Sequence, residues 1–80
     1  MVIVYILRSS SHGRYYTGIT KDLSGRLNIH NRGGTTSTRS GIPWEVVHKE
    51  DFPTRAQAME KEKIIKARGA ERYLQSLFGA

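Results

Sequence analysis

The sequence has no cysteine. This absence excludes a disulfide framework and any thiolate metal site, so the folded chain has to rely on packing alone. It also fits a protein of the reducing cytoplasm, which is the location we expect. Long apolar runs are missing too. The run over residues 2–7 is too short for the core of a signal peptide or for a membrane span, so we expect no membrane association and interpret this run as a buried strand.

Acidic residues are scarce. Seven Asp and Glu stand against thirteen Lys and Arg, which leaves a formal net charge of +6 on eighty residues. The excess is uneven: residues 1–40 hold six basic and one acidic residue (net +5), and residues 41–80 hold seven and six (net +1). Polyanions such as nucleic acids are the natural partners of such a chain, although a merely soluble basic surface would show the same excess. The length allows one domain, which we expect to span residues 1–80.

The order of the sequence patterns predicts a small α+β domain. Residues 2–7 are rich in β-branched and aromatic side chains, which favours a strand covered on both faces. A turn cluster over residues 9–13 and renewed strand character over residues 14–20 predict a β-hairpin. The elements that follow are a helix capped by Asp22 and ended by Gly33, a polar loop over residues 35–41, a strand over residues 44–48, a helix from the capping box of Thr54 and Gln57 to about Arg68, and a short helix over residues 70–78. The resulting order is β-β-α-β-α-α.

Two tyrosines stand on the strands of the predicted hairpin. Opposed residues of an antiparallel pair have numbers with a constant sum, so a register summing to 21 places Tyr5 and Tyr16 side by side on one face. A register one residue away would separate them. The alternative interpretation is a pair of ordinary core tyrosines, and the choice depends on what else converges there.

Arg26 and His30 are four residues apart on the first predicted helix and therefore share a face. A guanidinium beside an imidazole suits a phosphate, because both groups donate hydrogen bonds and the arginine charge is permanent. The same spacing is also common on a solvated helix face.

One carboxylate interrupts the apolar stripe of the second predicted helix. At about 100° per residue, Ala58, Met59 and Ile65 share one direction, and Glu62 falls between them. A carboxylate buried there needs a cation or hydrogen-bond donors, whereas Glu60 points nearly the opposite way and is typical of surface charge. A single carboxylate argues against a two-metal nuclease. It is consistent with one Mg²⁺ or Mn²⁺ held by one protein ligand, waters and a substrate phosphate.

These residues together resemble the GIY-YIG nuclease superfamily. Residues 3–5 (Ile-Val-Tyr) and 16–18 (Tyr-Thr-Gly) stand where its two signature triplets would be, with Ile3 in place of the first glycine and Thr17 in place of the central isoleucine. Later segments that resemble the family are Asp22-Leu23 with Arg26 and His30, then residues 38–39, 43–45 and 62–66. The resemblance covers nearly the whole chain in order. It is strongest to the small stand-alone bacterial branch, related to the nuclease domain of the excision-repair endonuclease.

The resemblance implies a three-stranded antiparallel sheet flanked by helices, and an endonuclease that cuts phosphodiester bonds with one divalent metal. It assigns five catalytic side chains: Tyr16 and Tyr5 near the attacking water, Arg26 on the scissile phosphate, His30 in proton transfer and Glu62 on the metal. Our further candidates for contacts to nucleic acid are Arg14, Arg39 and Lys66. A tyrosine with a pKa near 10 is a poor base unless a cation lowers that pKa, which we expect of the arginine and the metal.

Two other classes of protein stay open. One is a non-catalytic nucleic-acid-binding module with the same fold, and the other is a protein-interaction domain whose charge is incidental. The complete set of five side chains favours the enzyme, because a binding module has little reason to bury Glu62. No appended DNA-binding domain is evident, so we expect low sequence specificity. DNA is the favoured substrate, although the residues do not decide between DNA and RNA.

Overall fold

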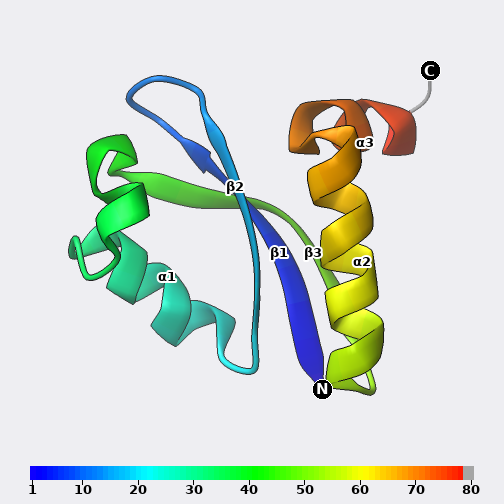
Figure 1. Ribbon diagram of the computed structural model, residues 1–80. Helices are drawn as coiled ribbons and strands as arrows, with labels where there is room; N and C mark the ends of the chain where they lie inside the picture. Colours follow the sequence, from blue (N-terminus) through cyan, green and yellow to red (C-terminus); the bar gives the residue numbers. More distant parts are fainter. Residues whose placement is uncertain (79–80) are drawn as a thin grey trace.

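The apolar first strand lies in the middle of the sheet. In the computed structural model of the chain, which describes residues 1–78, β1 (Val2–Ser9) pairs antiparallel with β2 (Tyr15–Thr20) on one side and with β3 (Trp44–Phe52) on the other (Figure 1). Strand β1 contributes Val4, Ile6 and Leu7 to the core with no exposed surface. This confirms the interpretation of residues 2–7 as a strand covered on both faces.

Helices cover the two faces of the sheet, with α1 (Leu23–Asn31) on one face and α2 (Arg55–Arg68) and α3 (Ala70–Leu77) on the other (Figure 1). The core is accordingly divided in two. Buried residues on the side of α2 and α3 are Val2, Val4, Ile6, Ala58, Ile65 and Tyr73. Those on the side of α1 are Tyr5, Leu7 and Trp44. The described residues therefore form the expected α+β fold in the order β-β-α-β-α-α, while the last two residues of the expected domain lie outside them.

Local capping signals set the helix boundaries. The carboxylate of Asp22 accepts a hydrogen bond from the backbone N–H of Gly25 at 3.1 Å, and a Cβ at Gly25 would lie only 2.3 Å from that carboxylate. Gly25, which weakens the first turn of α1, therefore leaves room for the capping carboxylate of Asp22. Thr54 caps α2 in the same way, accepting from the N–H of Gln57 at 3.2 Å. Gly69, with φ of 90°, separates α2 from α3.

Two segments differ from the sequence expectation. The polar loop contains a 3₁₀ helix, η1 (Thr36–Gly41), and β3 runs four residues beyond His48 to Phe52. The charges near the end of β3 obscured its strand pattern. Glu50 turns inward there, because the Tyr73 hydroxyl and His48 Nε2 bind its carboxylate, the latter at 2.8 Å, and Lys61 Nζ lies 3.7 Å from it. Tertiary partners thus stabilise a strand that its own composition disfavours.

None of the helices formed by residues 1–78 is long and apolar enough to cross a membrane. The longest of them, α2, has 14 residues, which is short of the roughly 20 that a bilayer core requires.

Candidate active site

The two tyrosines meet on the α1 side of the sheet, but in a different register from the one expected. Tyr5 lies opposite Gly18 and Tyr16 opposite Leu7, so paired numbers sum to 23 and not to 21. A shift of two residues keeps both side chains on one face, since side chains alternate with period two. The rings become diagonal neighbours, with centroids 6.3 Å apart and planes inclined by 40°. The shared face was expected correctly and the register was wrong.

Gly18 makes room for the Tyr5 hydroxyl. A Cβ at this position would lie 2.6 Å from Tyr5 Oη and 3.1 Å from a carbon of the Tyr16 ring. Both distances are shorter than normal van der Waals contact. The glycine of the second triplet therefore serves the approach of the two tyrosines.

We expect Gly18→Ala to destabilise the fold by about 1–3 kcal/mol, because the added methyl displaces a packed ring. Chemical denaturation measures this loss. The Tyr5→Phe background removes the oxygen at 2.6 Å and leaves the ring carbon Cζ at 2.8 Å, so the cost of Gly18→Ala should be reduced there but not abolished. Equal costs in both backgrounds would show that the tyrosine hydroxyl is not what excludes a side chain at this position.

His30 lies inside the protein. Its side chain has no exposed surface. Its Nε2 atom is 3.1 Å from Tyr5 Oη and its Nδ1 atom is 2.8 Å from Thr38 Oγ1, while the Tyr16 ring centroid lies 4.9 Å from that of the imidazole. The expectation that His30 shares a phosphate-facing surface with Arg26 is therefore wrong: both ring nitrogens are engaged within the chain. Burial, together with the nearby Arg26 charge, lowers the pKa of His30, which favours the neutral imidazole.

Arg26 lies one helical turn before His30 on α1, and its charge acts on the tyrosine pair. The Tyr5 hydroxyl, which interacts with the guanidinium, raises the pKa of Arg26, and Tyr16 adds to the effect. Arg26 also lines a groove of about 440 Å³ between the end of β2 and α1, and Arg32 lines the same groove one and a half turns further along. A phosphate in this groove would meet the charges of Arg26 and Arg32, with Asp22 also in the lining.

Without a metal, Arg26 alone does not lower the pKa of Tyr5. Burial raises the pKa of Tyr5 above 10, and the opposing effect of Arg26 does not outweigh it, while the Tyr16 hydroxyl and the Glu62 charge raise it further. Only 1% of Tyr5 is exposed. Tyr5 is therefore a protonated phenol at neutral pH in the protein without substrate.

Glu62 lies beside the apolar stripe of α2 on the side toward β2. Ala58 and Ile65 of that stripe are fully buried. At 100° per residue, Lys61 and Glu62 flank this direction on opposite sides. Because Lys61 contacts Glu50 on β3, Glu62 must lie toward the other edge of the sheet. Its negative charge accordingly reaches Tyr5, whose pKa it raises, and 22% of its side chain is exposed.

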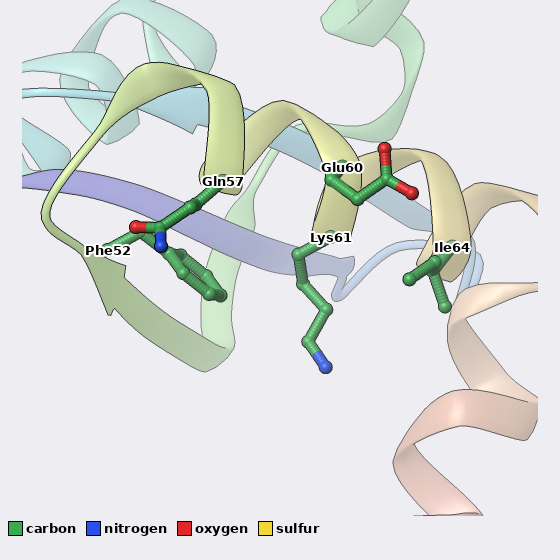
Figure 2. Close-up of a pocket in the computed structure, with 5 residues that line it drawn as sticks. All are labelled: Phe52, Gln57, Glu60, Lys61 and Ile64. Atoms are coloured by element: carbon green, nitrogen blue, oxygen red, sulfur yellow. The ribbon is translucent and has the colours of Figure 1, made fainter.

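The second glutamate of α2 is on the other side of the helix. Glu60 lines a cavity of about 310 Å³ together with Phe52 and Lys61, near the end of β3 (Figure 2). The tyrosines point to the face of the sheet opposite α2, and Glu62 is the glutamate of this helix whose charge acts on Tyr5. The separation of Glu60 from Glu62 that the helix pattern predicted is therefore confirmed, although Met59, which we placed in the apolar stripe, is 52% exposed.

The donor set fits one hard cation at most. Among residues 1–78 no group of three or more His, Asp or Glu side chains gathers as a metal cage. Glu62 offers one carboxylate, whose Oε2 lies 3.3 Å from Lys66 Nζ in a partly exposed i,i+4 pair. Such a pair is weak, about 0.3–0.5 kcal/mol, and a divalent ion can displace it. A single carboxylate with waters and substrate oxygens is a coordination that Mg²⁺ accepts.

The three candidates for contacts to nucleic acid are dispersed. Arg14 is exposed in the turn before β2. Arg39 is exposed in η1, where its Nε donates to the Gly33 carbonyl at 3.0 Å. Lys66 pairs with Glu62 on α2. Arg32, which we did not predict, lines the groove with Arg26.

Three further residues hold the site together and were not among the predicted site residues. Asn31 receives the backbone N–H of Trp44 at 2.6 Å and donates to its carbonyl at 2.9 Å, which ties α1 to the start of β3. The Trp44 indole donates to the Thr38 carbonyl at 2.7 Å. Thr38 in turn contacts His30. The resemblance covered Thr38 and Trp44, but no spacing in the sequence indicated these contacts.

Comparison with known proteins agrees with this geometry. Residues 1–74 match the model of the GIY-YIG catalytic domain. The chain therefore belongs to the GIY-YIG family, a class of catalytic domains with a nuclease-like fold. Several similar proteins carry the name UPF0213.

Two such relatives illustrate the similarity. A UPF0213 protein of Streptococcus agalactiae is 39% identical over 64 residues, covering 79% of this chain and 72% of the relative. One of Halobacterium salinarum is 41% identical over 64 residues, covering 79% and 82%. The solution NMR structure of the UPF0213 protein BH0048 from Bacillus halodurans matches with a TM-score of 0.58 and 33% identity, over 96% of this chain and 83% of that one. The α+β fold expected from the sequence is thereby confirmed.

Proposed function

We propose that this protein is an endonuclease that hydrolyses phosphodiester bonds of nucleic acid, DNA in preference to RNA, with one divalent metal and low sequence specificity. The observation that carries the proposal is the packing of Tyr5 and Tyr16 against His30 on the α1 side of the sheet, within reach of the charges of Arg26 and Glu62. The charges of both Arg26 and Glu62 act on the pKa of the same tyrosine. A closer relationship to the nuclease domain of the excision-repair endonuclease stays a prediction from the motifs.

The reaction needs a positioned water, positive charge on the phosphate oxygens and a stabilised leaving oxygen. Arg26 is suited to the phosphate, because its permanent charge lines the groove and its planar fork can bind two oxygens. Tyr16 is more exposed than Tyr5 and is suited to orient the attacking water. Water attacks phosphorus and loses a proton to a base or to solvent, the P–O bond to the leaving oxygen breaks, and that oxygen takes up a proton from solvent to become a hydroxyl group.

Glu62 would hold the metal, which would polarise a phosphate oxygen as a Lewis acid when bound. The remaining basic side chains serve binding. Most of the charge excess lies in residues 1–40, which include Arg26 and Arg32. Phosphate contacts of this kind position a nucleic acid without reading its sequence.

The deciding experiment is a panel of labelled nucleic acids incubated with the purified protein. The panel contains single strands, duplexes, flaps and nicked duplexes of DNA with matching RNA, each with Mg²⁺, with Mn²⁺ and with chelator. We expect cutting with metal and none with chelator, together with binding that weakens steeply as salt rises.

Two outcomes would contradict the proposal. Salt-dependent binding without cutting under any metal condition would identify a non-catalytic binding module. Neither binding nor cutting would favour a protein-interaction domain.

A further inference from the structure

A chain of polar contacts runs from the groove into the core on the α1 side of the sheet. It begins at the Tyr5 hydroxyl, which lies close enough to the Arg26 guanidinium for each group to shift the pKa of the other. Tyr5 Oη lies 3.1 Å from His30 Nε2, and His30 Nδ1 lies 2.8 Å from Thr38 Oγ1. The Thr38 hydroxyl then donates to the Thr35 carbonyl at 3.3 Å. The side chains of Tyr5, His30 and Thr38 are buried, so water does not compete for these contacts.

The two ends of this chain determine the direction of every proton between them. A guanidinium can only donate, and a backbone carbonyl can only accept. Because Thr38 gives its one hydroxyl proton to the carbonyl, its oxygen is left to accept from His30 Nδ1–H. A neutral imidazole with its proton on Nδ1 has a bare Nε2, which accepts the proton of Tyr5. The oxygen of Tyr5 is then free to accept from Arg26.

We propose that Thr38 is a positioning residue: it holds His30 in the neutral tautomer with the proton on Nδ1, and this tautomer turns the Tyr5 hydroxyl so that its oxygen faces Arg26. The opposite tautomer would direct Nε2–H at Tyr5 and would turn the phenol proton toward the guanidinium. Two donors would then face each other at the point where Arg26 is held. The hydroxyl of a residue in η1 thus controls the orientation of a side chain in the groove.

This inference deepens the proposed function, since the orientation of Arg26 matters for the reaction only if the protein cuts phosphodiester bonds. Its central claim concerns a proton, however, and it can be tested without any nucleic acid.

The test is the ¹⁵N NMR spectrum of the histidine rings in the whole protein, at a pH where they are neutral. Long-range ¹H–¹⁵N correlations identify which ring nitrogen carries the proton. We expect Nδ1–H for His30 in the natural chain and in Thr38→Ser, which keeps the hydroxyl. In Thr38→Val, which keeps the shape and removes the hydroxyl, the Nε2–H form should gain population. His12 and His48 are internal controls that should not change.

Cleavage provides the second measurement. Thr38→Val should lower the single-turnover rate by roughly tenfold to a hundredfold, by analogy with the loss of a hydrogen bond that orients a metal-ligating histidine. Thr38→Ser should retain most of the rate. The matched control is Thr36→Val, an exposed threonine of the same 3₁₀ helix, which should leave both the rate and the His30 tautomer unchanged.

Nε2–H at His30 in the natural chain would overturn the inference, and so would an unchanged tautomer in Thr38→Val. If the valine variant does not fold, the spectra of the natural chain and Thr38→Ser decide. Failure of the natural chain to cut any substrate would refute the proposed function. The tautomer measurement would still test the inference about Thr38 and His30.

Discussion

Replacement of Glu62 by alanine should abolish cleavage, while replacement of Glu60 should leave it nearly intact. We expect Glu62→Ala to lower the single-turnover rate by at least about 10³-fold, or roughly 4 kcal/mol of transition-state stabilisation, because the one carboxylate available to the metal is lost. Glu60→Ala removes the same charge from the same helix on its other side, and its rate should stay within about threefold of the natural chain. Glu62→Gln, which keeps the size of the side chain, should be as inactive as alanine.

Stability measurements on the Glu62→Ala and Glu60→Ala variants separate an effect on catalysis from an effect on folding. The Glu62–Lys66 contact is an i,i+4 pair whose lysine is exposed, so its loss should cost no more than about 0.5 kcal/mol of unfolding free energy. A metal titration followed by cleavage rate should show no recovery of Glu62→Ala in the range that saturates the natural chain. If Glu60→Ala is the inactive variant, the site lies at the cavity of Figure 2 and the assignment of faces on α2 is wrong.

Replacement of Arg26 should affect the reaction far more than binding. One guanidinium among thirteen basic residues adds little to overall affinity, but it can meet the charge that develops on the scissile phosphate. We expect Arg26→Ala to slow single-turnover cleavage by about 10²- to 10³-fold, the usual effect of removing one donor to a developing anion. Arg26→Lys should recover little, because an ammonium lacks the planar fork.

Arg32→Ala is the matched control for Arg26→Ala. Arg32 lines the same groove, but it is not among the groups that act on the pKa of Tyr5, so its loss should weaken binding modestly and leave the rate of the bound complex unchanged. Equilibrium binding and single-turnover cleavage on one substrate distinguish the two roles. If Arg26→Ala loses affinity in proportion to rate, its role is ordinary phosphate anchoring. Normal cleavage by Arg26→Ala would remove α1 from the catalytic assignment and favour the binding module.

The fold could be predicted from the sequence because its signals are local. Asp22 and Thr54 each cap a helix through a backbone group three residues away. Gly69 breaks a helix through its own φ of 90°. The unbroken apolar character of residues 2–7 similarly identified the central strand before any partner was known. The family signature added the three-stranded arrangement, which the order of elements alone left open.

The candidate site was predictable only in part, for the same reason. Positions on one helix follow from 3.6 residues per turn, so the opposite directions of Glu60 and Glu62 could be read directly. Burial could not. Arg26 and His30 share a helix face, but η1 and β1 cover His30 and leave Arg26 in a groove.

Sequence by itself determined the basic charge, the helix and strand boundaries that depend on neighbouring residues, and the set of side chains able to carry phosphodiester chemistry. Tertiary structure alone decided the β1–β2 register, the burial that raises the pKa of Tyr5 and lowers that of His30, and the contact of His30 with Thr38. Helix periodicity and capping act within a few residues of the chain. The pKa of a buried group and the tautomer of an imidazole depend on atoms that come together only when the sheet and α1 pack.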